Sequence, residues 1–220
     1  MREGLGSRLS TAGSTALWRA ARLLGRMRRR GKSLPVAWFI TDPNRTPDPM
    51  AIAERLPRGA GVIYRHFGRP NAEGQARQLA RIVRRRGLVL LIGAEAALAA
   101  KVGADGVHLP ERMSGAVHRL HARRPGWIVT VAAHSPRALR RATGADAALL
   151  STVFESRSPS AGRPIGVVRL AALVRTSAAP VIALGGVNAS TVRRLQRTEV
   201  AGFAAVEAFS KRWPDLSGQA

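Results

Sequence analysis

Eight short apolar segments, each followed by a helical pattern, constrain the fold of this 220-residue chain more than any other feature. Each segment is a continuous apolar run, which is typical of parallel strands with both faces buried. The expected strands are Val36–Thr41, Gly61–His66, Leu88–Ile92, Gly106–Leu109, Trp127–Ala132, Ala147–Val153, Val181–Leu184 and Gly202–Val206. Eight such units favour an α/β fold of the (β/α)8 TIM-barrel type over a doubly wound open sheet, whose GxGxxG fingerprint is absent after the first strand.

Between these strands, apolar residues recur at intervals of three or four positions, which is typical of helices with one buried face. The clearest helix start is Ser135-Pro136, a capping residue followed by a proline at the first helical position. The expected helices are Pro49–Leu56, Ala72–Arg86, Glu95–Val102, Ser114–Arg123, Ser135–Ala142, Val168–Thr176 and Ser190–Arg197. This rhythm assigns residues 34–214 to one TIM-barrel domain and leaves residues 1–33 as a basic N-terminal extension.

The basic extension, residues 1–33, holds nine Lys and Arg residues and one acid, Glu3. Its residues 15–30 (TALWRAARLLGRMRRR) fit a basic amphipathic helix with Trp18 and Leu24 on one side. The alternatives are a disordered or loosely packed segment, a helix that binds a membrane surface or a partner, and a start assigned too far upstream. We favour a disordered or loosely packed segment, or a start assigned too far upstream, with no more than weak binding to anionic surfaces through this arm.

The chain is strongly basic, with 36 Lys and Arg residues against 13 Asp and Glu and a net charge of +23. Such a charge attracts nucleic acid, anionic membranes and phosphorylated metabolites. Because the cations are spread over the expected helices and few aromatic residues lie among them, no specific nucleic-acid partner is expected. The absence of cysteine excludes disulfides, thiolate chemistry and cysteine zinc sites, and fits a cytoplasmic protein. A homo-oligomer is left open.

One motif, residues 179–188 (APVIALGGVN), has the form of a phosphate loop. An apolar strand runs into Gly185-Gly186, and a helical pattern opens shortly after Asn188. A strand, a glycine turn and a helix start can bring backbone N–H groups together around an anion. A Gly-Gly turn also occurs for steric reasons alone. Its place after the seventh strand favours phosphate binding, because TIM barrels commonly hold phosphate there.

Polar residues at the carboxyl ends of the other strands are further candidates, since TIM barrels keep their chemistry in these loops. His108 and His134 are candidate acid–base groups, the alternative being core or helix-capping histidines. Arg65 is a candidate for a two-pronged contact with phosphate, the alternative being a barrel arginine neutralised by an acid. The other polar candidates at the strand ends are Asp42, His66, Glu111, Ser135, Thr152, Glu155, Ser156, Arg157, Ser158, Asn188 and Glu207. No residues have the spacing of a Ser–His–Asp triad or of zinc ligands, so no metal ligand is assigned.

These motifs, taken together, resemble a known family. From about Leu34 to Arg212 the chain is similar to thiamine phosphate synthase and to its sibling, the thiazole tautomerase. The matching stretches are Phe39–Asp42 (FITD), Gly103–Leu109 (GADGVHL), Ala133–Ser135 (AHS), Ser151–Ser158 (STVFESRS), Pro180–Val187 (PVIALGGV) and Val200–Phe209 (VAGFAAVEAF). The order and spacing of GADGVHL and ALGGV make the resemblance fairly specific.

The resemblance implies a (β/α)8 barrel that acts in thiamine biosynthesis. The synthase joins a hydroxymethylpyrimidine pyrophosphate to a thiazole phosphate and releases pyrophosphate with magnesium, whereas the tautomerase isomerises a thiazole carboxylate phosphate without a metal. We therefore expect a thiamine phosphate synthase-like transferase or a divergent relative of it, with a phosphorylated small molecule as substrate. The alternatives are a metal-free tautomerase-like enzyme and a non-catalytic binder of a phosphorylated metabolite.

Five positions carry over from the family. Gly185 and Gly186 match its thiazole-phosphate loop, and Ser156 and Ser158 match its Thr-x-Thr after the sixth strand. Arg65 matches the arginine of its Arg-Glu-Lys motif after the second strand. The resemblance thus implies a phosphate site of two glycines and two serines. The candidate catalytic residues are Arg65 and His134, and the other expected pocket residues are Asp42, His108 and Glu207.

Other positions depart from the family pattern. The lysine of Arg-Glu-Lys is Phe67, the Asn-Asp after the third strand is Gly93-Ala94, and the second magnesium aspartate is Met113. A pyrophosphate leaving group needs its metal and its cations, so magnesium is expected only if synthase activity is retained. The serine that holds phosphate after the eighth strand is Glu207. Glu207 would repel a phosphate unless Arg157 or another cation compensates.

Overall fold

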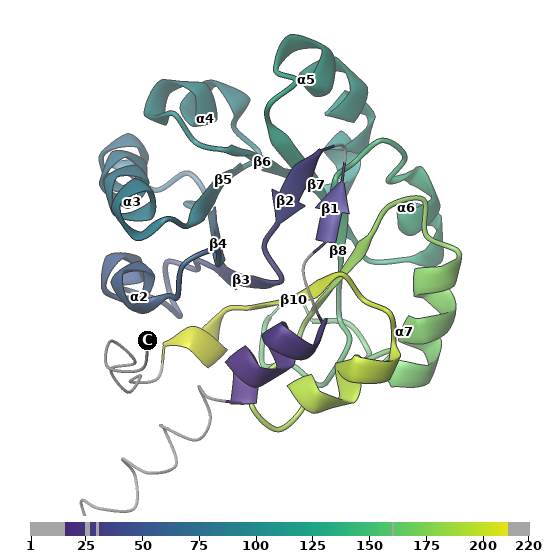
Figure 1. Cartoon of the computed structure of the whole chain (residues 1–220). Coiled ribbons are helices and arrows are strands. Elements are labelled where there is room, and N and C mark those ends of the chain that lie inside the picture. Colours follow the sequence, from purple (N-terminus) through teal and green to yellow (C-terminus); the bar gives the residue numbers. More distant parts are fainter. Residues whose placement is uncertain (1–15, 25–26, 30, 160, 211–220) are drawn as a thin grey trace, which may run out of the picture.

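A closed ring of eight parallel strands forms the centre of the computed structural model (Figure 1). The structure describes residues 16–24, 27–29, 31–159 and 161–210. The expectations for residues 1–15 and 211–214 lie outside these ranges. The strands follow one another around the ring in chain order, and the last pairs with the first. The predicted (β/α)8 barrel is therefore confirmed.

Every expected strand is present in the barrel, with ends that differ by a few residues. The ring closes through the last strand, where Phe203 lies opposite both Ala37 of the first strand and Ala183 of the seventh. The barrel strands are β3 (Ala37–Ile40), β4 (Gly61–Tyr64), β5 (Val89–Gly93), β6 (Gly106–Leu109), β7 (Ile128–Ala133), β8 (Ala147–Leu150), β9 (Val181–Leu184) and β10 (Gly202–Ala205).

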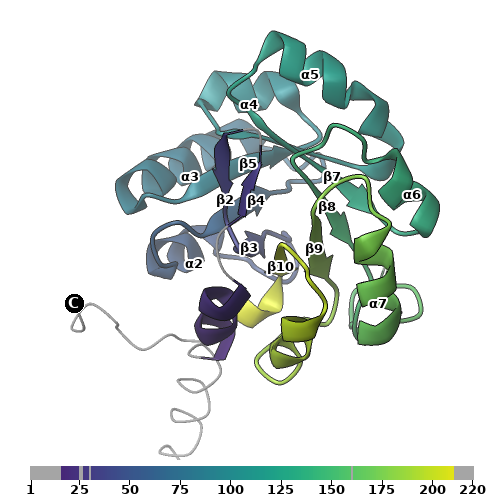
Figure 2. The same ribbon diagram turned by 45° about the vertical axis from the view of Figure 1, so that its right-hand side comes forward.

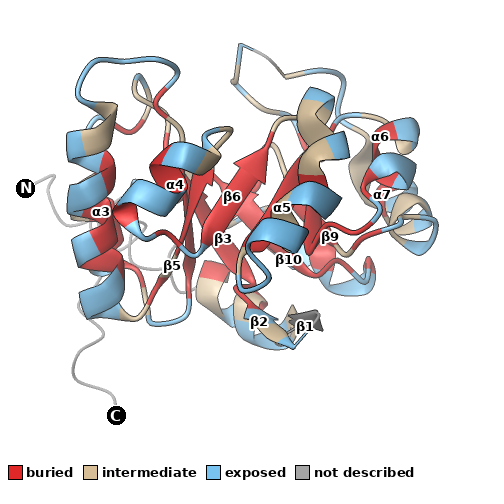
Figure 3. Ribbon diagram, turned by 90° about the horizontal axis from the view of Figure 1, so that it is seen from above, coloured by how far each residue is buried: buried red, intermediate tan, exposed pale blue. Residues whose placement is uncertain are grey.

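Both faces of these strands are buried, which explains why the sequence shows continuous apolar runs (Figure 3). Alternate residues of a strand point to opposite faces. In β3, Trp38 and Ile40 belong to the cluster inside the barrel, where they meet Leu91 and Leu149. Phe39 belongs to the larger cluster between the strands and the surrounding helices. The barrel is thus filled with side chains, and ligands have access only at its ends.

Helices and 3-10 turns surround the ring (Figures 1 and 2). Ser135 caps its helix as expected, because its Oγ accepts the Ala138 N–H at 3.1 Å. The elements are α2 (Pro49–Arg55), α3 (Ala72–Arg86), α4 (Ala96–Val102), η1 (Glu111–Ala116), α5 (Val117–Arg123), α6 (Pro136–Arg141), α7 (Gly166–Arg175), η2 (Val192–Arg197) and η3 (Glu207–Phe209).

Two expected helices differ from the prediction. The helix expected at Ser190–Arg197 begins only at η2 and has 3-10 geometry. The Asn188 side chain accepts the N–H groups of Ser190 and Thr191 and holds both residues in a turn. The helix expected at Ser114–Arg123 is divided into η1 and α5. Gly115, a poor helix former, lies in η1 near the division.

Residues 16–24 form a helix, drawn in dark purple, that packs on the barrel beside β10 and η3 (Figures 1 and 2). Leu17 and Ala20 are each only 1% exposed. The Trp18 ring lies 5.9 Å from that of Phe209, which in turn lies 6.1 Å from that of Phe39. This differs from the expectation of a loosely packed segment, because the apolar face of the helix is buried against the barrel.

A hairpin of β1 (Met27–Arg29) and β2 (Lys32–Leu34) connects this helix to the barrel. Lys32 Nζ lies 3.4 Å from Oδ2 of the buried Asp146, which precedes β8, so the hairpin lies at the amino ends of the strands. The opposite end of the barrel is left open for a ligand. Within the described residues, no helix has the length and apolar character needed to cross a bilayer.

Candidate functional site at the carboxyl ends of the strands

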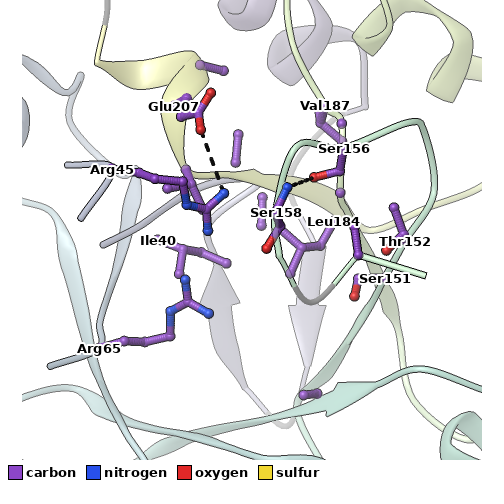
Figure 4. A pocket seen from close by; sticks show the side chains of 18 of the residues that line it. Ile40, Arg45, Arg65, Ser151, Thr152, Ser156, Ser158, Leu184, Val187 and Glu207 are labelled. Carbon is purple, nitrogen blue, oxygen red and sulfur yellow. Dashed lines mark hydrogen bonds and ion pairs between the residues drawn. The ribbon is translucent and has the colours of Figure 1, made fainter. Parts of the chain in front are cut away.

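A cavity of about 900 Å³ opens at the carboxyl ends of the barrel strands, and loops after all eight strands contribute to it (Figure 4). This volume suits a small-molecule ligand. Of the nine predicted site residues, all except Asp42 line it: Arg65, His108, His134, Ser156, Ser158, Gly185, Gly186 and Glu207. Figure 4 shows Arg45 and Arg65 on one side of the cavity and Ser156 and Ser158 on the other.

The Gly185–Gly186 turn has a backbone that only glycine adopts without strain. Both residues have positive φ angles, +93° and +64°. A Cβ on Gly186 would lie 2.2 Å from the carbonyl oxygen of Glu155, and one on Gly185 would lie 2.8 Å from Thr152 Cγ2. The loop after β8 therefore packs directly on this turn, and the Phe154 N–H donates to the Gly185 carbonyl at 3.0 Å. Close packing of two loops explains why both glycines are needed.

Side chains beyond the turn fix its orientation. The Gly186 carbonyl accepts from Asn188 Nδ2 at 3.2 Å and from Thr191 Oγ1 at 2.9 Å. Within the described part of the chain, the N–H groups of Gly186 and Val187 have no hydrogen-bond acceptor. A carbonyl tied back on the helix side leaves these two N–H groups available to an anion in the cavity.

The serines of the loop after β8 lie beside this turn (Figure 4). Ser156 Oγ accepts the Ser158 N–H at 3.3 Å, so the two serines hold a local turn and both still line the cavity. Arg157, between them, also lines the cavity. Hydroxyl groups, backbone N–H groups and a guanidinium are all donors that phosphate oxygens accept. This side of the cavity is therefore equipped to bind a phosphate.

Arg65 extends from the end of β4 toward the opposite side of the cavity. Its Nε donates to the Thr41 carbonyl at 3.1 Å, and its Nη2 lies 3.6 Å from Asp42 Oδ2. Burial lowers the pKa of Arg65 to about 10, although the Asp42 charge acts in the opposite direction. Arg65 is therefore still charged at neutral pH, and its partly desolvated guanidinium interacts more strongly with an anion than one in water would.

Asp42 lies behind the cavity wall and organises the two arginines that face the cavity. Its Oδ2 accepts from Arg45 Nη2 at 2.8 Å, and Arg45 Nη1 also lies 3.8 Å from Glu207 Oε1. Burial raises the pKa of Asp42, but hydrogen bonds from Arg45 and from the Asn44 backbone outweigh burial and lower it below its usual value. The cation beside Glu207 is thus Arg45, which agrees with the expectation that Arg157 or another cation compensates this carboxylate.

His108 lies buried on β6, and its Nδ1 forms a hydrogen bond with Thr130 Oγ1 at 2.9 Å. Burial lowers the pKa of His108 to about 3, and the charges of Arg65 and His134 act in the same direction. His108 is therefore neutral near pH 7. A histidine with so low a pKa serves as a neutral hydrogen-bonding group of the cavity floor and not as a general acid.

His134 is held by Glu111 at the end of β7. Glu111 Oε2 lies 2.9 Å from His134 Nδ1 and accepts the His134 backbone N–H at 3.0 Å. A carboxylate at this distance favours the tautomer in which Nδ1 carries the proton. The other ring nitrogen, Nε2, is then the basic one, and His134 itself lines the cavity. The contact with Glu111 could not be foreseen from the sequence, because 23 positions separate the two residues.

Several cavity residues were missed by the sequence analysis. Arg45 lines the cavity three positions after Asp42, and the only sequence signal was its place in the loop after the first strand. Glu95 also lines the cavity, and its Oε1 lies 2.8 Å from Nε2 of His66, which was already a candidate at the end of the second strand. Phe67, noted only as a departure from a motif, projects at the cavity mouth.

Comparisons with known proteins agree with this geometry. Residues 37–209 match the family model described as thiamine monophosphate synthase. Over 138 residues the chain is 31% identical to the putative thiamine-phosphate synthase 2 of Aquifex aeolicus. The matched region covers 61% of this chain and 73% of that protein. Over 177 residues it is 29% identical to the thiamine-phosphate synthase of Pyrococcus furiosus, with 78% and 84% covered.

A solved structure shows the same fold. The thiamine phosphate pyrophosphorylase from Pyrococcus furiosus superposes with a TM-score of 0.65 at 23% sequence identity, covering 80% of this chain and 90% of that one. The region matched by the family model contains all eight barrel strands and, apart from Leu17, every described residue that lines the cavity. The chain therefore belongs to the thiamine monophosphate synthase family.

Proposed function

We propose that this protein binds the phosphate of a small heterocyclic phosphate monoester of thiamine biosynthesis at the Gly185–Gly186 turn, and that it does not perform magnesium-dependent coupling. The observation that supports this most is the turn itself. Its two positive-φ glycines leave no room for a Cβ. Gly186 and Val187 line the cavity together with Ser156 and Ser158, and within the described residues their N–H groups have no protein acceptor. Backbone donors at a strand–helix junction are suited to phosphate.

Magnesium, which the synthase reaction would need, does not fit the residues at this cavity. Mg²⁺ requires oxygen ligands, normally including carboxylates. Gly93-Ala94 and Met113 supply none, and a Cβ on Gly93 would lie 3.2 Å from Arg65 Cγ, so the arginine uses the space that a larger side chain would need. Among the described residues, no group of three His, Cys, Asp or Glu side chains is arranged to hold a metal ion.

Without a metal, two activities suit the cavity: proton transfer on the bound ester, and binding without reaction. The Glu111–His134 contact favours proton transfer, since it leaves His134 Nε2 free to accept a proton from a ligand. Arg65, charged and partly buried, would stabilise negative charge that develops on the ligand. His134 is thus the proposed base and Arg65 the proposed electrostatic partner.

Calorimetry and an activity assay test the two parts of the proposal separately. We expect thiazole phosphate or thiamine phosphate to bind, and we expect no pyrophosphate release from the two synthase precursors with magnesium. Failure of both esters and of inorganic phosphate to bind would overturn the phosphate site. Pyrophosphate release that is lost in an Arg65→Ala variant would overturn the metal-free assignment. A His134→Gln variant should bind as the wild type does but lose any isomerase activity.

The wider predictions about partners and location belong to the same proposal. A phosphorylated metabolite as ligand fits a cytoplasmic protein. The burial of Leu17 and Ala20 leaves less apolar surface at residues 16–24 for a membrane than the sequence suggested. Cosedimentation with anionic vesicles tests the expected weak surface binding through residues 1–33, and light scattering tests the homo-oligomer.

A further inference from the structure

Phe67 is presented to solvent at the cavity mouth in a conformation that costs free energy. It lies in the loop between β4 and α3, lines the cavity and is 66% exposed. Its φ of +51° is in the left-handed region, which is strained for a bulky residue. Neither the exposure of an aromatic ring nor the strained backbone stabilises the fold, so the arrangement calls for another explanation.

The loop that carries Phe67 is held in place on both sides. The Gly68 N–H donates to His66 Nδ1 at 3.1 Å, and the Arg69 N–H donates to the His66 carbonyl at 3.0 Å. His66 is itself anchored by its 2.8 Å contact with Glu95. The position of the ring at the mouth is therefore built into a hydrogen-bonded turn and does not depend on a mobile tip.

The ring also interacts with Arg65, the partly buried cation of the site. Arg65 Cζ lies 5.0 Å from the Phe67 ring centroid, within the range of a cation–π contact. Arg65 is fixed in turn by its hydrogen bond to the Thr41 carbonyl. An aromatic ring thus lies directly beside the guanidinium that faces the cavity, so one ligand can meet both groups.

Phe67 and the glycine turn both follow barrel strands that are close to each other in the ring. Phe67 follows β4 and the glycine turn follows β9, and only β3 and β10 lie between these strands. Three steps of about 4.8 Å along the barrel wall place these two strands roughly 14 Å apart. A planar ring joined to a phosphate through a second ring or a short chain can span this distance.

We propose that Phe67 is a stacking platform for a planar heteroaromatic ring of the ligand whose phosphate binds at the Gly185–Gly186 turn. The proposal rests on the proposed phosphate site and adds a specificity to it. Phosphate esters that carry an aromatic ring are favoured over esters without one, because only a planar ring gains from offset stacking on the face of the Phe67 ring.

Calorimetry on Phe67→Ala and Phe67→Tyr variants, with four probes, tests this platform. The probes are thiamine phosphate, thiazole phosphate, glycerol phosphate and inorganic phosphate. In the Phe67→Ala variant we expect the affinity to fall about three- to tenfold for thiamine phosphate or thiazole phosphate, whichever binds wild type more tightly. The affinities for glycerol phosphate and inorganic phosphate should stay constant. Phe67→Tyr keeps the ring and should bind as the wild type does. Val168→Ala, at a position 85% exposed on α7, is the matched control for loss of a surface apolar group.

The outcomes separate this platform from the phosphate site itself. If wild-type protein binds inorganic phosphate but prefers no aromatic ester over glycerol phosphate, the platform is refuted and the phosphate site stands. An equal loss for all four probes in Phe67→Ala would refute the platform as well, since it would indicate a general disturbance of the mouth. If no probe binds to wild-type protein, both proposals fail.

Discussion

The two sides of the cavity mouth are built in different ways. On the β8–β9 side, the donors are backbone N–H groups and serine hydroxyls, and the shape depends on two glycines with no room for a Cβ. On the β3–β5 side, the functional groups are charged side chains that already pair with each other. Arg45 contacts Asp42 and Glu207, Arg65 contacts Asp42, and His66 contacts Glu95.

This difference indicates what each side can do for a ligand. The backbone donors are preorganised, so an anion can bind there without breaking an existing ion pair. On the charged side, a ligand competes with Asp42 and Glu207 for the same guanidinium groups. Under the proposed function, the β8–β9 side would determine whether a phosphate binds, and the β3–β5 side would modulate which ligand is preferred.

The largest expected effect comes from Gly186→Ala, which disrupts the glycine turn on the β8–β9 side. The new Cβ would lie 2.2 Å from the Glu155 carbonyl oxygen at a φ of +64°. We expect phosphate binding to be lost and the free energy of unfolding to fall by about 2–4 kcal/mol. Chemical denaturation and calorimetry measure both quantities. Gly126→Ala is the control, because no atom lies within 4 Å of its added Cβ. Wild-type affinity in Gly186→Ala would show that the turn does not hold the phosphate.

The strands and the glycine turn of the β8–β9 side could be predicted from the sequence, because glycine pairs and apolar runs are local patterns. A continuous apolar strand and Gly185-Gly186 are readable without knowing any distant contact. The strand order of the barrel followed from the same rhythm. Only helix details failed: η2 starts late because the Asn188 side chain captures the N–H groups of two following residues, which periodicity does not reveal.

The charged side was less predictable because its groups act through contacts between distant loops. Arg45 became relevant only when β10 placed Glu207 within 3.8 Å of it. Asp42 was expected to be a pocket residue, but it does not line the cavity, and its carboxylate contacts Arg45 and Arg65 instead. The helix at residues 16–24 was expected to be loosely packed, because its pattern cannot tell a face that covers a barrel from one that meets a membrane.

The second prediction tests the charged side through Arg65→Lys. Lysine keeps the positive charge but lacks the planar guanidinium group. It therefore cannot donate to the Thr41 carbonyl and to a ligand at the same time in the way that Arg65 can. We expect the affinity for an anionic ligand to fall by about tenfold and inorganic phosphate, bound at the glycine turn, to be affected less. Calorimetry measures the change, with Arg141→Lys on α6 as the matched control. Equal losses for all anions would place Arg65 in the phosphate site itself and remove the distinction between the two sides.

The third prediction concerns the floor between the two sides. His108 has a folded-state pKa of about 3, well below the unfolded value, so the unfolded chain takes up a proton first as the pH falls. The contribution of neutral His108 is fully present above about pH 6.5 and is lost as the pH falls toward 3, by up to about 1.4 kcal/mol per pH unit. Denaturation between pH 7 and 4 should therefore show a shallower decline in His108→Gln than in wild type. His118→Gln, an exposed site, should leave the slope unchanged, and identical slopes for all three proteins would contradict a neutral buried histidine.

The smallest expected effect comes from Glu207→Gln, which removes a carboxylate from the mouth. Glu207 is 46% exposed and its contact with Arg45 is long, so solvent screens most of its charge. Its removal frees Arg45 from one competing acid while Asp42 still holds the other side of the guanidinium. We expect the affinity for a phosphate ester to rise about two- to fivefold at low salt. The difference in affinity between variant and wild type should become smaller at high ionic strength, because salt screens the charge of Glu207.

Glu199→Gln is the control, since it makes the same charge change away from the cavity and should have no such effect. A loss of affinity in Glu207→Gln would mean that this carboxylate contacts the ligand directly, and the ligand would then have to carry a cation or an N–H donor at the β10 edge of the mouth.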